Sequence, residues 1–137
     1  ESSWRSDRGA TEMKEQKITL SPLGHTWIFD LDGTLVKHNG YKEGGEELLP
    51  GAKELLDRIP AGDMVIILTA RKEEVRGQTE AFLREHGIRY DKIIFGAPYG
   101  ERIVVNDRKP SGLNMSVAVN IDRDDISILT FDIDEEL

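Results

Sequence analysis

The sequence predicts an α/β fold with a mainly parallel sheet. Apolar runs of strand length recur along the chain, at residues 26–30, 64–68, 93–95, 103–105 and 117–119, with a weaker run at 126–131. Two segments between them, 52–59 and 72–86, space their apolar residues as amphipathic helices do. Because strands that alternate with helices favour parallel pairing through right-handed crossovers, a three-layer α/β/α arrangement is expected.

Each element has a local cause. The strand at 26–30 follows a turn at 21–24. The continuous apolar run 64–68 is typical of the middle of a parallel sheet, where both faces are covered. The helix at 72–86 should stop at Gly87, which can take the left-handed conformation that ends many helices.

Length and composition limit the classes of protein. The 137 residues suit one domain, which we expect at 21–137 after a flexible polar lead at 1–20. The chain has no Cys, which excludes disulfides and thiolate chemistry and fits a cytoplasmic location. No run approaches the ~18 apolar residues of a membrane span. The net charge of −8 makes a nucleic-acid partner unlikely, because phosphate neutralisation needs clustered Lys and Arg.

Residues capable of chemistry stand directly after three of the predicted strands. Ligand sites in parallel α/β sheets form beyond the carboxyl ends of the strands. The residues in these places are Asp30, Asp32, Thr69, Arg71, Asn106 and Asp107. Two carboxylates two residues apart can divide the work of a nucleophile and a general acid, with a divalent cation between them.

The run F-D-L-D-G-T-L, residues 29–35, resembles the first signature motif of the haloacid dehalogenase (HAD) superfamily, whose members are mostly magnesium-dependent phosphatases. The resemblance implies a Rossmann-like, HAD-like fold. It also implies that Asp30 attacks phosphorus to form an aspartyl-phosphate, while Asp32 protonates the leaving alcohol and later activates water. Gly33 and Thr34 would belong to the phosphate-binding turn.

Two further motifs extend the resemblance. In I-I-L-T-A-R, Thr69 would donate its hydroxyl to phosphoryl oxygens, and Ala70 and Arg71 would lie at the substrate, with Arg71 able to bind phosphate through two N–H groups. In V-V-N-D-R-K-P, Asp107 would be a metal-binding acid, and Asn106 would bind the metal or orient a water. With Asp30 and the carbonyl of Asp32 these residues form an all-oxygen set suited to Mg²⁺.

The Lys or Arg of the remaining HAD motif has no match in its usual place, 96–101. Lys109 is our choice for this role, shared with Arg71. Lys92 and Arg102 begin predicted strands, so each is expected about 10–17 Å from the carboxyl end of its strand.

Short loops at 36–50 and 96–101 leave no room for a large cap domain. An open site of this kind predicts either a macromolecular substrate or closure by a neighbouring subunit, and we expect a homo-oligomer. The motifs T-A-R, G-I-R-Y-D, G-E-R-I-V-V-N-D-R-K-P and A-V-N resemble those of small bacterial HAD hydrolases of capsule and lipopolysaccharide sugar synthesis. A small phosphorylated substrate, such as a sugar phosphate, is thus implied.

Other interpretations stay open. A nucleic-acid 3′-phosphatase would share D-x-D-G-T and T-A-R but should carry a basic groove. A non-catalytic metal-binding interaction domain is the second alternative, since Asn106 stands where many relatives have Asp. Thr69 alone could be a helix cap, and Lys109 a solvated loop charge.

Overall fold

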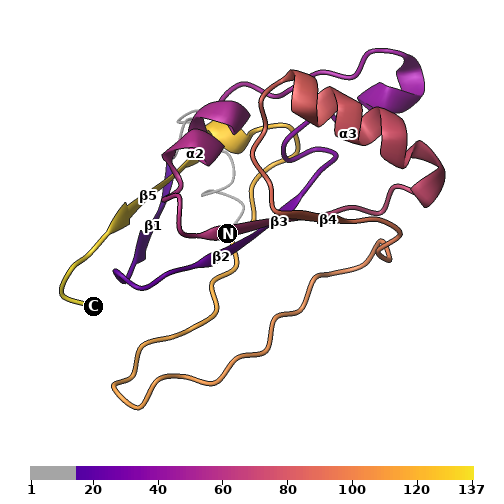
Figure 1. Cartoon of the computed structure of the whole chain (residues 1–137). Helices are drawn as coiled ribbons and strands as arrows, with labels where there is room; N and C mark the ends of the chain where they lie inside the picture. Colours follow the sequence, from indigo (N-terminus) through magenta and orange to yellow (C-terminus); the bar gives the residue numbers. More distant parts are fainter. Residues whose placement is uncertain (1–14) are drawn as a thin grey trace, which may run out of the picture.

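The computed structural model describes residues 15–137 and has an α/β architecture with parallel strands (Figure 1). Most of the predicted lead, residues 1–14, lies outside the described residues. The elements in chain order are β1 (Gln16–Leu20), β2 (Thr26–Asp30), η1 (Gly40–Glu43), α2 (Ala52–Arg58), β3 (Met64–Leu68), η2 (Glu73–Val75), α3 (Arg76–Glu85), β4 (Lys92–Ile94), η3 (Ile126–Ile128) and β5 (Leu129–Ile133). None of the helices within 15–137 is long and apolar enough to cross a bilayer.

The main sheet has the order β2-β3-β4 and is parallel throughout. Its strands fall where the apolar runs predict them, to within one residue. The register pairs Asp30 of β2 with Leu68 of β3, and Leu68 with Ile94 of β4. The three carboxyl ends therefore meet at one edge of the sheet.

A second, two-stranded sheet joins the two ends of the described chain. β1 pairs in parallel with β5, from Gln16 opposite Leu129 to Leu20 opposite Ile133. β1 thus occupies the last residues of the segment that the sequence assigned to the lead. The strand predicted at 126–131 is displaced, because residues 126–128 form η3 and the strand begins only at Leu129.

The strands predicted at 103–105 and 117–119 are wrong. Residues 98–120 have no helix or strand and form one long excursion, which we call the arm. Figure 1 shows it leaving the end of β4 and passing on the side of the sheet opposite α2 and α3. The connection from β4 to 103–105 is too short for a parallel crossover, which needs about a dozen residues, so this apolar run reaches no partner strand.

The core lies between one face of the main sheet and the two helices. Buried apolar side chains from both layers form a single cluster that includes Phe29, Leu55, Leu56, Val65, Ile67 and Leu83. The opposite face has no helix over it in Figure 1, so the described chain does not form the expected third layer. Burial of each such side chain contributes about 1.5–3 kcal/mol.

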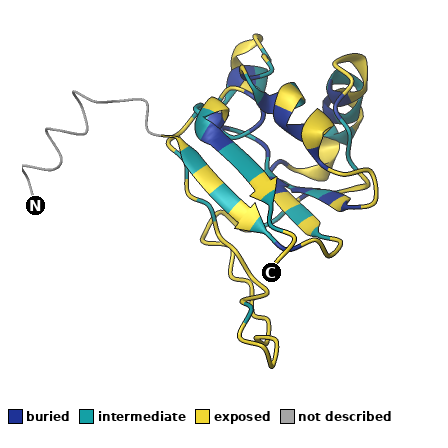
Figure 2. Cartoon of the chain, turned by 90° about the vertical axis from the view of Figure 1, so that its left-hand side faces the viewer, coloured by how far each residue is buried: buried dark blue, intermediate teal, exposed yellow. Residues whose placement is uncertain are grey.

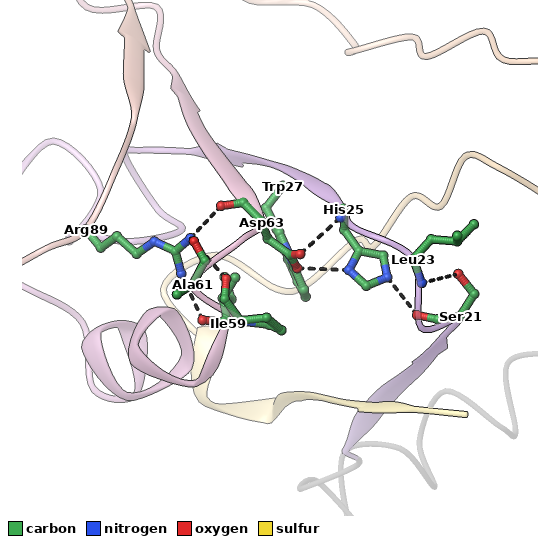
Figure 3. A network of polar contacts seen from close by, with 9 residues as sticks. Ser21, Leu23, His25, Trp27, Ile59, Ala61, Asp63 and Arg89 are labelled. Atoms are coloured by element: carbon green, nitrogen blue, oxygen red, sulfur yellow. Dashed lines mark hydrogen bonds and ion pairs between the residues drawn. The ribbon is translucent and has the colours of Figure 1, made fainter. Parts of the chain in front are cut away.

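A polar network fixes the amino-terminal side of the sheet (Figure 3). The buried carboxylate of Asp63 accepts hydrogen bonds from the His25 backbone N–H at 3.0 Å, His25 Nδ1 at 2.9 Å and Trp27 Nε1 at 3.0 Å. His25 Nε2 meets the Ser21 carbonyl at 2.9 Å. The two ring nitrogens therefore link Asp63 to the turn at 21–24.

Arg89 completes this network from the far side. Its Nη1 lies 2.8 Å from the Ile59 carbonyl, and its Nη2 lies 3.1 Å from the Pro60 carbonyl and 2.5 Å from the Asp63 carbonyl. These carbonyls follow the end of α2, where backbone oxygens lack helical partners. The guanidinium therefore joins the end of α2 to the start of β3.

The network sets the acid–base properties of Asp63. Burial by itself raises the pKa of this carboxyl group, but the hydrogen bonds from Trp27 and His25 outweigh burial and hold the pKa below its usual range. A pKa that is lower in the folded than in the unfolded chain stabilises the fold above the unfolded value and loses that effect as pH falls.

Replacing Asp63 with Asn should lower the free energy of unfolding by about 1–3 kcal/mol at pH 7, because its donors lose a charged acceptor. The difference from the unsubstituted chain should shrink as pH falls below about 4, the unfolded pKa of Asp. Urea unfolding between pH 7 and pH 3 measures both effects. Asp57→Asn, at an exposed pair with Lys53, is the control. A difference that does not change with pH would contradict this account.

Candidate functional site

A cleft of about 530 Å³ lies beyond the carboxyl ends of β2 and β3. Acidic and basic side chains line it together: Asp30, Asp32, Lys42, Arg71, Arg102 and Arg123. Because the parallel strands end at the same edge, the residues of the first two sequence motifs meet here. A cleft with this mixture of charges suits a small polar ligand that carries negative charge.

Asp30 is the accessible carboxylate of the cleft. Its side chain is 41 % exposed, whereas that of Asp32 is 20 % exposed. Thr34 Oγ1 donates to Asp30 Oδ2 at 3.3 Å, and Arg102 Nη1 lies 3.4 Å from Oδ1. An exposed carboxylate that is oriented by two donors can act as a nucleophile toward a bound group.

The turn after β2 holds these groups in place. The Leu31 carbonyl accepts hydrogen bonds from the backbone N–H groups of Thr34, Leu35 and Val36. Leu31 and Leu35 are fully buried and anchor the turn in the core. Gly33 has φ +86°, a left-handed conformation in which an added Cβ would also lie 3.3 Å from Arg123 Cγ. The turn therefore requires glycine at this position.

Arg71 is buried beneath the cleft, with a side chain only 1 % exposed. Its Nε and Nη2 bind the two carboxylate oxygens of Asp32 at 3.0 and 2.9 Å. Nη2 also binds Glu46 Oε2 at 2.5 Å, and Nη1 donates to Thr79 Oγ1 at 2.8 Å. The guanidinium carbon lies 3.9 Å from the centre of the Tyr41 ring. Arg71 thus connects β3, α3 and the loops after β2.

Two carboxylates balance the charge of Arg71. Burial by itself lowers the pKa of the guanidinium, but hydrogen bonds to Asp32 and Glu46 outweigh burial and raise the pKa. All three nitrogens of the guanidinium already have protein partners, so Arg71 could bind a phosphate through two N–H groups only by exchanging some of them. Its role in this structure is to orient Asp32.

Thr69 lies below the cleft, not on its wall. The residue is 1 % exposed, and its Oγ1 accepts the backbone N–H of Arg71 at 3.0 Å. Its backbone extends the sheet beyond β3, because its N–H donates to the Ile94 carbonyl and its carbonyl accepts from Ala97. Ala70 is the member of this motif that lines the cleft beside Arg71.

The structure does not bring Asn106, Asp107 and Lys109 to the cleft. All three are exposed on the arm. Asn106 Nδ2 donates to the carbonyl and to Oδ1 of Asp107, both at 3.3 Å. The Lys109 backbone N–H donates to the Leu113 carbonyl and closes a turn at the tip of the arm.

The residues proposed for Mg²⁺ are therefore not assembled in the single chain. Within residues 15–137, no three or more Asp, Glu, His or Cys side chains are grouped in a way that could hold a metal ion. Both carboxylate oxygens of Asp32 face Arg71, which leaves Asp30 as the accessible carboxylate of the expected set in the cleft. The donor set in the cleft does not fit a magnesium site by itself.

Arg102 is a site residue that the sequence reasoning missed. It was excluded because a strand was expected to begin beside it, which would put its side chain at the opposite edge of the sheet. Residues 103–105 form no strand, so the chain turns and Arg102 reaches Asp30. The spacing of Asp30 and Asp32 says nothing about Arg102. The position of Arg102 depends on whether residues 103–105 form a strand, which the tertiary structure decides.

Glu46, Arg123 and Asp124 also take part in the site without any motif to reveal them. Glu46 binds Arg71. Asp124 donates its backbone N–H to the Gly33 carbonyl at 2.8 Å, and its Oδ1 accepts the His38 N–H at 3.0 Å. These contacts hold the loop after the arm against the turn after β2.

Comparisons with known protein families, with curated proteins and with solved structures found no match.

Replacing Arg71 with Leu should lower the free energy of unfolding by about 3 kcal/mol or more, because Asp32 and Glu46 would keep largely buried charges without a partner. Urea unfolding at pH 7 measures the change. Arg76→Leu is the matched control, since Arg76 pairs with Glu73 at the surface and its loss should cost measurably less. Equal losses in the two variants would contradict the argument.

Proposed function

We propose that this chain is a HAD-like phosphomonoester hydrolase that works through an aspartyl-phosphate on Asp30. The observation that carries the proposal is the exposed Asp30 carboxylate at the shared carboxyl edge of β2 and β3, oriented by Thr34 and facing Arg102. The motifs F-D-L-D-G-T-L and I-I-L-T-A-R support it by resemblance. The assignment of the α/β fold as a Rossmann-like HAD fold is part of this proposal.

The first step forms a covalent intermediate. A carboxylate oxygen of Asp30 attacks the phosphorus of a singly protonated phosphate monoester, the P–O bond to the alcohol breaks, and the proton of the ester passes through the Asp32 carboxylate to the departing oxygen. Arg102 and Arg123 lie in the cleft to offset the negative charge of the phosphoryl oxygens.

The second step releases phosphate. Asp32, now a carboxylate, takes a proton from a water molecule that attacks phosphorus, and the bond from Asp30 to phosphorus breaks. The paired N–H groups of Arg71 hold Asp32 in one orientation for both proton transfers. Asp32 passes this proton to the released phosphate, so both carboxylates end the cycle ionised, as at the start.

Mg²⁺ stays our proposed cofactor on the strength of the resemblance. Its proposed ligands are Asp30, the Asp32 carbonyl, Asp107 and Asn106, which the single chain leaves apart.

A small phosphorylated metabolite, foremost a sugar phosphate, is the proposed substrate. The cleft volume and its mixed charges suit such a molecule better than an extended polyanion. A homo-oligomeric state and a cytoplasmic location are parts of the same proposal.

Asp30→Asn should abolish hydrolysis of an aryl phosphate, a loss of at least about a thousandfold, because the amide cannot form the acyl phosphate. Steady-state release of the aryl alcohol with Mg²⁺ measures it, and EDTA should remove the activity of the unsubstituted chain as well. Asp57→Asn, on the exposed side of α2, is the control. Activity that survives in Asp30→Asn would refute the proposed nucleophile.

Arg102→Gln should lower kcat/KM by roughly tenfold to a hundredfold, the expected effect of one charge-assisted hydrogen bond to the reacting groups. Lys92→Gln removes the same charge at the other end of the sheet and should have little effect. The same assay applied to Lys109→Gln decides between the two cations. A larger loss in Lys109→Gln than in Arg102→Gln would return the role to Lys109.

A further inference from the structure

One apolar face of the main sheet is left uncovered by the described part of the chain. The register places Ile28, Met64 and Ile94 on the same side of the sheet, and these side chains are 52 %, 44 % and 47 % exposed. We call this side the open face. Sheets built only of parallel strands are normally covered on both faces, so an apolar face of this kind indicates a missing layer.

The arm has the complementary property. On its outgoing part, residues 98–108, Ile103 and Val105 are 83 % and 89 % exposed, and Val104 is 56 % exposed. Among the backbone hydrogen bonds of the described chain, none involves residues 98–108. In Figure 2 the arm hangs away from the body and is coloured as exposed along nearly all its length. Residues 103–105 are thus an exposed apolar run within a segment whose backbone has no backbone hydrogen-bond partner in the described chain.

The arm is held at both ends but not between them. Ala97 donates its backbone N–H to the Thr69 carbonyl, and Arg102 contacts Asp30. On the return side, Val119 and Ile121 pack against the core. Residues 103–105 nevertheless stand in solvent. Within residues 15–137, the open face and the arm are therefore both unpartnered.

We infer that the arm of a second copy of this chain covers the open face, and that the two copies exchange arms about a twofold axis. Each copy offers the same arm and the same face, as a closed symmetric dimer requires. Exchange would bury the apolar residues of both surfaces and give the arm a packed partner.

The exchange also supplies the carboxylate that the cleft lacks, a consequence that rests on the proposed function. Ile28 and Asp30 are two residues apart on β2 and lie on the same side of the strand. Val105 and Asp107 have the same spacing, about 6.5 Å in extended chain. If Val105 packs beside Ile28 of the other copy with the chains parallel, Asp107 comes to that copy's Asp30. The two carboxylates are then brought together between chains.

The absence of Cys makes this interface directly testable. Chains carrying only Ile28→Cys are mixed with differently tagged chains carrying only Val105→Cys, and a short bismaleimide is added. We expect cross-links between the two tagged chains, with Glu54→Cys on α2 as a control that forms few. Two results would overturn the inference. One is a doubly substituted chain that cross-links only within itself, and the other is a yield of cross-links between chains no higher than that of the control.

The mass in solution gives a second, independent test. The unsubstituted chain should sediment at twice the mass of one chain. Val105→Asp should weaken association at least about tenfold, because a charge is placed in an apolar contact. Ser111→Asp adds the same charge at the tip of the arm and should have a smaller effect. A single-chain mass for the unsubstituted protein would overturn the proposal.

Complementation tests the sharing of the site. Asp30→Asn and Asp107→Asn chains, each inactive alone, are unfolded together and refolded. Random pairing should restore about a quarter of the activity, since half of the dimers carry one intact site. No restoration from cross-linked mixed dimers would refute delivery of Asp107 by the partner. If the unsubstituted protein has no activity, the proposed function fails, while cross-linking and mass still decide the interface.

Discussion

The buried guanidinium of Arg71 is the constraint on which the site depends. A charge removed from water is tolerated only when it is balanced and its hydrogen bonds are made. Asp32 and Glu46 balance the charge, and Thr79 Oγ1 accepts a hydrogen bond from Nη1 of the guanidinium. These partners come from the turn after β2, the loop after η1 and helix α3. Meeting the electrostatic requirement of one side chain therefore fixes three segments around the cleft.

The same ion cluster gives the two carboxylates of the cleft different environments. Asp32 is oriented by Arg71, whereas Asp30 stays accessible and contacts Thr34 and Arg102. Two acids two residues apart thus have different environments, which is the condition for separate roles as nucleophile and proton-transfer group. The arrangement supports the phosphoryl chemistry proposed for the cleft.

The parts of the fold that were predicted correctly are those with local causes. The apolar run of β3 and the helical spacing of α2 and α3 are visible in short windows, and Gly87 ends its helix at φ +67° as expected. The pairing of β1 with β5 joins segments more than a hundred residues apart, for which no local pattern exists. The runs at 103–105 and 117–119 have strand-like composition but no neighbour, and a strand exists only where another strand accepts its hydrogen bonds.

The sequence alone determined the strand, the turn and the position of Asp30, Asp32, Gly33 and Thr34 at its end, because these residues are adjacent in the chain and their geometry follows from local backbone preferences. Only the tertiary structure decided which charges meet. In it, Arg71 binds Asp32 and Glu46, Arg102 contacts Asp30, and Asp107 lies on an exposed arm. Contacts of this kind depend on how distant loops pack. Their stability arises from the whole folded chain, so no short segment contains the information that predicts them.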